Sequence, residues 1–596
     1  MVCVQGSLSY LFRGREFTWD FFAVQPVERL GVSVRGVKQR VDDGYRFTLL
    51  LQPAEEIVLR RLSVEVPIDL GPSARVFVNG FQSWTESREY EQDEKIRKLF
   101  WPARVLLGQY GDYGLYRYPS KRGRFHGWTY SYITSSGSLD FFGSLSERDG
   151  YTLFEYDCSR KILRISRECS GLHIKSQFKG LDFLRLSGTE DQVFDAYFQA
   201  YLEEKGPRPA LPDPLTGWTS WYNYFTAVSM DAVTANLEEF RKREVPIGLL
   251  QVDDGWQPAI GDWLSSNEKF PLGMAAVTSS VKTLPGPVKA GLWLAPFICE
   301  KKSALWKEHR DWVLRDRRGK PVRAGYNPNW GGWFYALDFH NQEFREHLRQ
   351  VFRTVLDEWG FDLVKLDFLY AAALMPAQDK TTGQIMTEAM EFLRSVCGDK
   401  LILGCGVPLG PAFGAVDYCR IGSDVGLQWE DRILKLVGYR ERVSTINSIT
   451  STIGRRHLNG RAFLNDPDVF ILRTPHQEMT PDQKMTLFRV NLALGGIVLT
   501  SDNLADYTEA ELSAYLSAFP FGKKTVRGVE KHGGAYLIRF DSGEGHNVLI
   551  ANLSGRPQTL LAQPGSYEYG AVDGADADGR FTLRPFESKE VAKAER

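Results

Sequence analysis

Aspartate residues that could act as nucleophiles or acids follow short apolar runs at several points in the chain. Residues 363–368 (LVKLDF) are typical of a buried strand, in which alternation places Lys365 and Asp367 on one side. A lysine facing a buried interior is costly unless it is neutralised, so we expect Lys365 to pair with Asp367 and keep that carboxylate ionised, as a nucleophile must be. An ion pair with a purely structural role would give the same pattern. The sequence of this strand alone does not distinguish a structural pair from a catalytic one.

A second candidate lies in residues 417–424 (DYCRIGSD). Arg420, Gly422 and Asp424 share one parity, so we expect Arg420 and Asp424 to face inward and Gly422 to leave room for a ligand. Two carboxylates across a pocket suit glycoside hydrolysis, about 5–5.5 Å apart for retention and about 6.5–9.5 Å for inversion. An acid must hold its proton, which requires a raised pKa for Asp424. We therefore expect Arg420 to pair elsewhere, with Asp367 or the substrate.

Two adjacent aspartates occupy residues 252–256 (VDDGW). A turn at Gly255 would let both Asp253 and Asp254 reach the rim of a pocket. Carboxylates accept strong hydrogen bonds from vicinal sugar hydroxyls. For Asp254 taken alone, a solvated charge in an Asp-Gly turn is the better interpretation.

These groups need a scaffold that gathers strand ends, and residues 215–522 predict a (β/α)₈ TIM barrel. Eight candidate strands end near Trp221, Asp253, Ala295, Asp367, Cys405, Asp424, Asn465 and Asp502. Helical periodicity separates them, as at Phe344, Leu348, Val351, Phe352, Val355, Leu356 and Trp359, and we expect Asp231 to cap a helix that buries Val233, Leu237 and Phe240. Reactive groups of such barrels lie at the carboxyl ends of the strands.

The flanking regions predict three further parts, making a multidomain chain. Short strand-like runs separated by turn residues over 1–190 predict an N-terminal β-sandwich. Residues 191–214 are a helical and proline-rich linker, and residues 523–596 predict a small C-terminal antiparallel β domain.

Composition excludes several classes of function. A formal net charge of −1 predicts no nucleic-acid partner, and no apolar run is long enough for a membrane span. The 7 cysteines and 9 histidines are scattered without metal-ligand spacing, so we expect reduced thiols, a cytoplasmic location, no metal and no cofactor. The 15 Trp, 25 Tyr and 36 Phe suit sugar faces, although a large aromatic core predicts the same richness.

Several segments, in order along the chain, resemble glycoside hydrolase family 36, in the clan that also holds the family 27 α-galactosidases. They are residues 80–84 (GFQSW), 217–224 (GWTSWYNY), 252–256 (VDDGW), 291–296 (GLWLAP), 365–367 (KLD), 420–424 (RIGSD) and 465–468 (NDPD). Two elements differ from the family pattern. The acid/base segment continues Val425-Gly426-Leu427, and Gly404-Cys405-Gly406-Val407 is shorter than the usual glycine-rich form.

The resemblance implies a retaining, exo-acting α-galactosidase that hydrolyses terminal α-galactosyl residues of oligosaccharides. It implies Asp367 as nucleophile and Asp424 as acid/base. It further implies a set of substrate-binding residues, namely Asp253, Asp254, Lys365, Arg420, Cys405, Trp293, Trp84 and Trp218.

Alternatives stay open from the sequence. The near ones are an α-N-acetylgalactosaminidase, a β-L-arabinopyranosidase and a galactosyl-transferring enzyme. A magnesium-dependent barrel enzyme could use Asp253, Asp367 and Asp424 as ligands, although Lys365 and Arg420 oppose a dication there. A non-catalytic sugar-binding protein is less favoured because both candidate carboxylates are present. The chain could also form a homo-oligomer.

Overall fold

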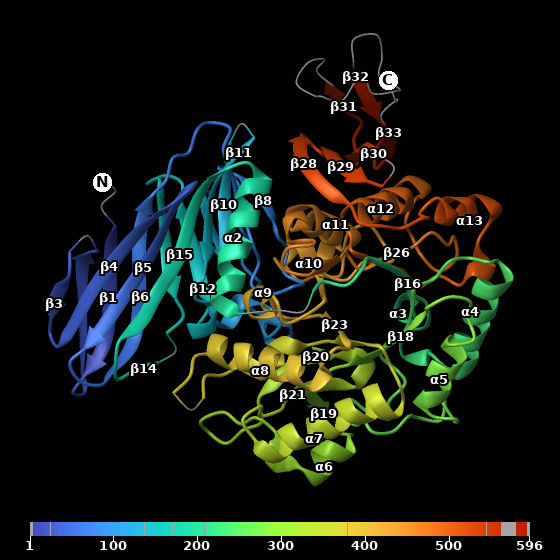
Figure 1. The fold of residues 1–596 in the computed structure, drawn as a ribbon, viewed down its shortest axis with the longest axis horizontal. Coiled ribbons are helices and arrows are strands. Elements are labelled where there is room, and N and C mark those ends of the chain that lie inside the picture. Colours follow the sequence, from blue (N-terminus) through green and yellow to red (C-terminus); the bar gives the residue numbers. More distant parts are fainter. Residues whose placement is uncertain are drawn as a thin grey trace.

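The computed structural model describes residues 4–592, apart from residues 24, 136, 170, 207–209, 378, 544 and 562–579. Three residues of the predicted linker and a long stretch of the predicted C-terminal domain therefore lie outside the described residues. Figure 1 shows a β-sandwich beside a barrel, with a small β domain against the barrel's last helices. This arrangement confirms the predicted multidomain fold class, with a central barrel and flanking β domains.

Two antiparallel sheets form the N-terminal sandwich. Alternating side chains of the strands, such as Leu62, Val64 and Val66 of β6, point into a shared apolar core. The first sheet runs β2 (Arg15–Phe22), β1 (Gln5–Phe12), β6 (Ile57–Pro67), β13 (Ile162–Arg167), β12 (Thr152–Asp157) and β9 (Arg124–Trp128), with β14 (His173–Ile174) beside β6. The second runs β3 (Val27–Arg29), β4 (Val32–Val41), β5 (Gly44–Pro53), β15 (Phe178–Gly188), β11 (Ser138–Ser144), β10 (Tyr130–Ser135), β7 (Arg75–Val78) and β8 (Arg88–Glu91).

Helix α2 (Glu190–Lys205) leads from the sandwich to the barrel. A capping box between Thr189 and Gln192 begins the helix. Its buried side packs on the sandwich, where the Tyr197 hydroxyl donates to the Ser144 carbonyl at 2.9 Å. At the helix's far end, the Tyr201 hydroxyl donates to the Gly410 carbonyl of the barrel at 2.8 Å.

Eight parallel strands form the barrel, as predicted. Their order around it is β25 (Leu464–Asp466), β24 (Tyr418–Arg420), β23 (Leu401–Gly404), β22 (Leu363–Leu366), β18 (Lys289–Leu294), β17 (Leu249–Val252), β16 (Leu215–Thr219) and β27 (Ile497–Thr500), with the short β26 (Val469–Phe470) beside β27. The Gly496 N–H donates to the Asn465 carbonyl at 2.8 Å, which joins the first and last of these strands.

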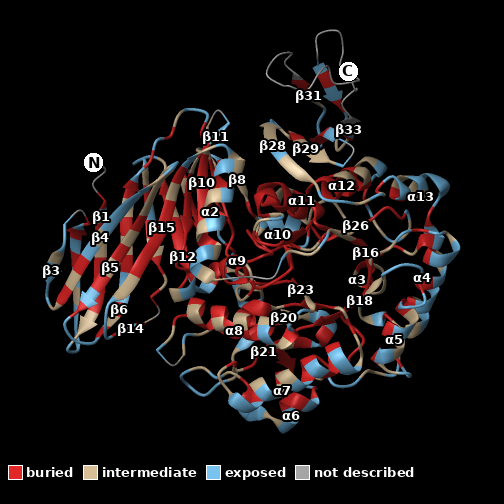
Figure 2. Ribbon diagram, viewed as in Figure 1, coloured by how far each residue is buried: buried red, intermediate tan, exposed pale blue. Residues whose placement is uncertain are grey.

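Helices surround the strands. In Figure 2 helices such as α4 and α7 show buried residues on one side and exposed residues on the other, whereas α11 is buried nearly all round. Helix α7 buries the predicted stripe, including Phe344, Leu348 and Val351, and then continues into a π-helical turn. Helix α4 also buries the expected residues, but Ser229 caps it and Asp231 lies in its first turn, so the cap prediction was wrong. The longer helices are α4 (Met230–Lys242), α5 (Met274–Val281), α7 (Gln342–Arg353), α8 (Thr382–Cys397), α11 (Thr445–Gly454), α12 (Pro481–Leu494) and α13 (Glu509–Leu516).

A small antiparallel domain follows the barrel. It contains a sheet of β28 (Thr525–His532), β29 (Ala535–Ser542), β30 (Gly545–Asn552) and β33 (Ser588–Ala592), and a hairpin of β31 (Gln558–Leu561) and β32 (Arg580–Leu583). It contacts α12, where the Thr486 hydroxyl donates to the Phe586 carbonyl at 2.7 Å.

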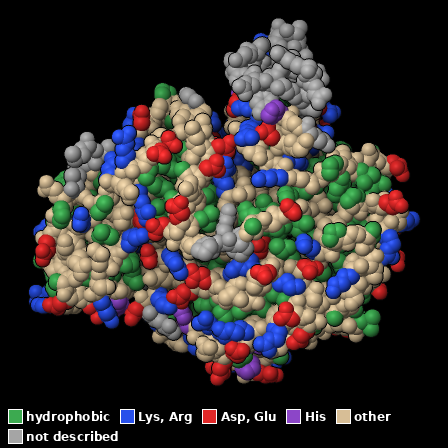
Figure 3. Space-filling model, in the orientation of Figure 1, with side chains coloured by type: hydrophobic (Ala, Val, Ile, Leu, Met, Phe, Trp, Pro, Cys, Tyr) green, Lys and Arg blue, Asp and Glu red, His purple; other side chains and the backbone are tan. Residues whose placement is uncertain are grey.

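The outer surface mixes both signs of charge. Figure 3 shows Lys and Arg interspersed with Asp and Glu over the face in view, which agrees with the near-zero net charge. Within the described part of the chain, no helix combines the length and the apolar character needed to cross a bilayer.

Candidate active site

The carboxyl end of strand β22 holds Asp367 in a buried, fully bonded position. One carboxylate oxygen accepts from the Trp293 indole at 3.0 Å, and the other accepts from the Phe368 N–H at 2.9 Å. Phe368 has a φ of 53°, a left-handed conformation that is uncommon outside glycine. Its ring packs against Trp84 and Trp330, which helps to hold this turn. The carboxylate is therefore fixed in direction before any ligand arrives.

The ionisation of Asp367 follows from competing effects. Burial raises its pKa above the ordinary value, the charge of Asp424 adds to the rise, and the Lys365 ammonium and the Trp293 hydrogen bond oppose it. We expected Lys365 to dominate, but the net direction is upward because the site is desolvated. The charges of Lys365 and Asp424 thus both act on the pKa of Asp367, in opposite directions.

Lys365 does not pair with Asp367, so that prediction was wrong. Its ammonium donates to Asp253 at 2.8 Å, at the tip of β17. Gln251 also donates to Asp253, at 2.9 Å, and holds the Thr219 hydroxyl with the same amide group. The long lysine side chain of β22 instead reaches past β18 to the end of β17, the next strand but one in the barrel.

Asp254 is not the solvated charge that the Asp-Gly turn suggested, because only 2% of its surface is exposed. One oxygen accepts from Gln257 at 2.6 Å and the other from the Trp330 indole at 2.8 Å. Burial raises the pKa of Asp254 to about 6. Trp330 therefore belongs to the site wall, whereas Trp333 is half-buried and lies under Arg323.

A loop of the sandwich completes the site. Trp84 donates its indole N–H to the Cys405 sulfur at 3.1 Å, across the boundary between the two domains. Cys405 follows β23 and its thiol also lowers the pKa of Asp367. Gly406 is required here, because its φ is 58° and a side-chain carbon would lie 2.8 Å from the Trp84 ring. The structure thus brings the predicted Trp84, Cys405 and Asp367 together.

Arg455, which the sequence did not single out, fixes this loop to the barrel. Its guanidinium is fully buried and donates to Asn79 and to the carbonyls of Gly80, Gln82, Ser83 and Ile421 at 2.7–3.1 Å. Burial lowers its pKa to about 10. No short motif marks such an arginine, because its partners are backbone carbonyls far away in the sequence.

We expect Arg455→Met to reduce the free energy of unfolding by about 3–5 kcal/mol, because several buried acceptors lose their donor together. Denaturant unfolding followed by tryptophan fluorescence would measure the loss. The matched control is Arg349→Met, which removes an exposed ion pair to Glu346 on α7 and should cost less than about 1 kcal/mol. Equal stability of the two variants would contradict the role given to Arg455.

Arg420 contacts three carboxylates, including the one we expected it to avoid. It donates to Asp424 at 2.7 Å, to Asp466 at 3.1 Å and to Asp468 at 2.7 Å. The prediction that Arg420 pairs away from Asp424 was therefore wrong, although the contact is through one nitrogen to one oxygen. Asp466 and Asp468 lie in the quoted NDPD segment, which carried no role in the sequence interpretation.

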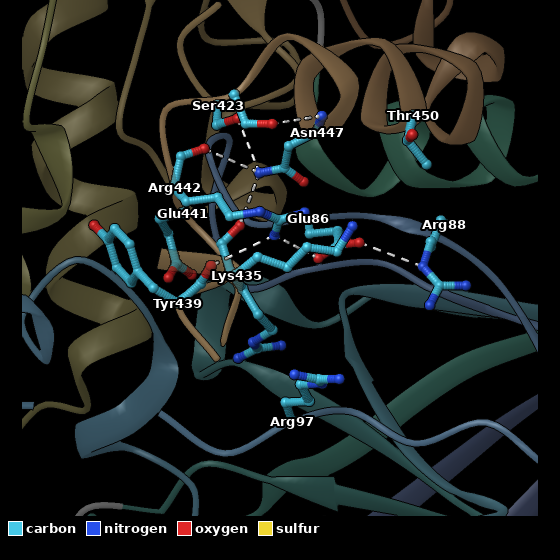
Figure 4. Close-up of polar contacts among 12 residues, drawn as sticks. Glu86, Arg88, Arg97, Ser423, Lys435, Tyr439, Glu441, Arg442, Asn447 and Thr450 are labelled. Atoms are coloured by element: carbon cyan, nitrogen blue, oxygen red, sulfur yellow. Dashed lines mark hydrogen bonds and ion pairs between the residues drawn. The ribbon is translucent and has the colours of Figure 1, made fainter. Parts of the chain in front are cut away.

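Asp424 lies beyond the end of β24, with 36% of its side chain exposed. The segment after it is held by the Ser444 N–H, which donates to the Asp424 carbonyl at 2.9 Å. Figure 4 shows how this region is tied to the sandwich: Asn447 donates to Ser423 and to the Arg442 carbonyl, and Arg442 pairs with Glu86. A partly exposed acid on a braced segment can meet a ligand that enters from solvent.

Two predicted residues are not placed as expected. Gly422 does not open space for a ligand, because a side-chain carbon there would meet Ser448 and Ser451 of α11. Trp218 of β16 has the opposite parity to Thr219, and its indole donates to the Asp502 carbonyl while its ring packs on Tyr224. Trp218 thus contacts the Asp502 carbonyl and Tyr224, and its indole is not bonded to Asp253, Asp367 or Asp424.

The strand tips as a whole present buried carboxylates with two cations and several indoles around one region. No group of three or more His, Cys, Asp or Glu in the described residues is arranged to hold a metal ion. Several carboxylates beside indole rings at the strand ends of a parallel barrel are features that suit a glycoside hydrolase. That is the class that the fold and the site define.

Comparison with known proteins finds similarity to α-galactosidases. The melibiase family model matches residues 212–392. An α-galactosidase of Escherichia coli is 30% identical over 123 residues, 20% of this chain and 16% of the relative. The bifunctional α-galactosidase/sucrose kinase AgaSK of Mediterraneibacter gnavus is 26% identical over 208 residues, 33% of this chain and 20% of the relative. These matches thus span a fifth or less of the curated relatives.

Solved structures extend the likeness over nearly the whole chain. TtGalA, an α-galactosidase from Thermus thermophilus in complex with p-nitrophenyl α-D-galactopyranoside, is 29% identical with a TM-score of 0.68, covering 88% of this chain and 98% of that one. AgaA from Geobacillus stearothermophilus, a family 36 α-galactosidase, shares the fold at 12% identity with a TM-score of 0.62, covering 98% and 88%. The chain is thus similar in fold to α-galactosidases of glycoside hydrolase family 36, and its residues 212–392 match the melibiase model.

Proposed function

We propose that this chain is a retaining α-galactosidase that removes terminal α-galactosyl residues from oligosaccharides by double displacement. The observation that carries the proposal is Asp367, held by Trp293 at the tip of β22, with the partly exposed Asp424 nearby. Supporting it, TtGalA is an α-galactosidase described in complex with stachyose, and it is 27% identical to this chain.

In the first step an Asp367 oxygen attacks the anomeric carbon and forms a galactosyl ester. The bond from that carbon to the leaving oxygen breaks, and this oxygen takes the proton from Asp424. In the second step Asp424 removes a proton from water, whose oxygen attacks the same carbon and releases Asp367. Two inversions leave the α configuration unchanged.

The side chains around the nucleophile Asp367 would bind the sugar. Asp253 and Asp254 offer carboxylate oxygens, and Lys365 offers its ammonium, to the hydroxyls on the far side of the ring. Trp84, Trp293 and Trp330 supply apolar surface for the ring's C–H bonds. Cys405 lies beside Asp367, in the shortened glycine-rich segment at residues 404–407. This segment would contact the substituent at the 2-position of the sugar.

One plate of p-nitrophenyl glycosides tests the proposal. We expect α-galactose to be released at least about tenfold faster, by kcat/KM, than α-N-acetylgalactosamine, α-glucose or β-L-arabinopyranose, because each loses or crowds one hydroxyl contact. Preference for the N-acetyl substrate would overturn the substrate assignment. Proton NMR of the first-formed sugar should show the α anomer, and the β anomer would overturn retention.

We expect the KM for α-galactosides to rise as pH falls through about 6. The pKa of Asp254 is raised to about 6 by burial, so below that pH the group is protonated and loses its charge-assisted bonds to sugar hydroxyls. KM measured from pH 4.5 to 8 would show the rise. Asp254→Asn should bind weakly at every pH and lose this dependence; a dependence unchanged in that variant would assign it to another group.

We expect EDTA to leave the rate unchanged, because Asp253 is bonded to Lys365 and Gln251 and Asp424 to Arg420. Activity assayed after dialysis against chelator, with and without added magnesium, measures this. Loss of activity that magnesium restores would favour the metal-dependent alternative.

We further propose that the enzyme works in the cytoplasm. Cys158, Cys169, Cys299, Cys397, Cys405 and Cys419 are free thiols, which is the state expected in a reducing compartment.

A further inference from the structure

The contact between Arg420 and Asp424 raises a question about the proposed acid. A guanidinium at 2.7 Å favours the charged form of a carboxyl group, whereas the acid must carry a proton when the leaving oxygen departs. Something has to offset the charge of Arg420. The residues that can do so are on the next strand and its following turn, in the NDPD segment.

Hydrogen bonds to both carboxylate oxygens and to the backbone hold Asp468 in place. One oxygen accepts from Arg420 at 2.7 Å, and the other accepts from the Val425 N–H at 2.8 Å and from the Tyr222 hydroxyl. Its backbone N–H donates to Asp466 at 2.8 Å, and its φ of 75° is a left-handed conformation. Such a conformation costs energy and persists only where the surroundings impose it. Asp468 thus bonds both the Arg420 guanidinium and the backbone of Val425, the residue next to Asp424.

We propose that Asp468 is a positioning residue that, with Asp466, neutralises Arg420 and so allows Asp424 to keep its proton until the leaving oxygen takes it. Above about pH 7, where Asp468 is ionised, the two carboxylates outweigh the single positive charge of Arg420, so that the charge around Asp424 is negative. After the proton leaves, the same Arg420 hydrogen bond stabilises the Asp424 anion. The inference rests on the proposed role of Asp424 as acid/base.

Other charged and titratable groups lie around this cluster, among them Arg473, which donates to the Tyr222 carbonyl at 2.9 Å and pairs with Asp502. Lys365 and Asp367 face it from β22, Cys405 from the end of β23 and Tyr222 from the turn after β16. Burial raises the pKa of Asp468 to about 7, and the Arg420 charge opposes the rise. Asp468 and Asp424 share one guanidinium, and the charge of Asp424 adds to the rise in the pKa of Asp468.

The test is the dependence of kcat/KM on pH for stachyose. Asp468→Asn keeps the size of the side chain but removes its charge, so the alkaline limb should move down by about one pH unit, an about tenfold loss of rate on that limb. Asp468→Glu keeps the charge and should keep the position of the limb even if kcat falls. Asp140→Asn, which removes a carboxylate paired with Arg185 in the sandwich, is the matched control and should match the unmodified enzyme.

An even loss of rate at every pH in Asp468→Asn, with the limb unmoved, would overturn the proposal and leave a purely structural residue. If that variant does not fold, Tyr222→Phe replaces it. Removing the donor makes Asp468 neutral to higher pH, so the limb should again move down, and an unmoved limb would again overturn the idea. A failure of the proposed function would give a different result. If Asp424 is the acid, Asp424→Asn removes the alkaline limb of the pH profile; if it is not, the variant keeps that limb.

Discussion

Asp367→Ala is expected to lower kcat by about 10⁴-fold or more on every α-galactoside, whatever its leaving group. The reason is that no glycosyl ester can form without this carboxylate, and good leaving groups do not replace a missing nucleophile. The surrounding groups, including the Trp293 indole that donates to Asp367 at 3.0 Å, stay in place. The measurement is a steady-state assay on both an aryl galactoside and stachyose.

Azide gives this experiment a second, stereochemical readout. In Asp367→Ala, azide can enter the space of the lost carboxylate and attack the anomeric carbon directly, so the product should be a β-galactosyl azide. The Asp140→Asn variant should give none. A residual rate above about one hundredth of the original, without azide, would show that another group is the nucleophile.

Asp424→Ala is the second large effect, and its size should depend on the leaving group. Stachyose needs its leaving oxygen protonated, so its kcat/KM should fall by about 10³-fold, whereas p-nitrophenolate departs unprotonated and the first step should fall far less. Hydrolysis of the ester then becomes slow because water has lost its base. A burst of p-nitrophenol should therefore precede a slow steady state.

Azide again separates the roles, because it needs no base to attack the ester. In Asp424→Ala it should speed turnover of p-nitrophenyl α-galactoside and yield the α-galactosyl azide, opposite to the product expected from Asp367→Ala. Arg420 would then retain its bonds to Asp466 and Asp468. Equal losses on stachyose and the aryl substrate, or a β azide, would contradict the assignment of Asp424.

Local sequence patterns were sufficient for the architecture. The eight strands of the barrel fall where alternation of apolar runs and helical periodicity predicted them, because each strand and helix must bury its own apolar face. The same patterns put Asp253 and Asp367 at strand tips and gave Lys365 and Asp367 a common side. The family motifs likewise pointed to Trp84 on a sandwich loop, which the structure places 3.1 Å from Cys405.

Pairing, in contrast, was decided only by the tertiary structure. Lys365 bonds Asp253 rather than Asp367, and Arg420 bonds Asp424, Asp466 and Asp468. Parity tells which side of a strand a residue faces, but a long cationic side chain chooses among all acceptors within its reach, and those come from other strands.

Burial and close packing were decided in the same way. Asp254 is buried because Gln257 and Trp330 close over it, Trp330 coming from a loop 76 residues away. Gly422 makes room for α11 and not for a ligand, and Arg455 serves carbonyls of a distant loop. The amino-acid sequence by itself determined which elements form and which side chains their faces carry, because that depends on neighbours a few residues apart. Which groups meet depends on how the closed barrel and the sandwich dock, and only the folded chain specifies that.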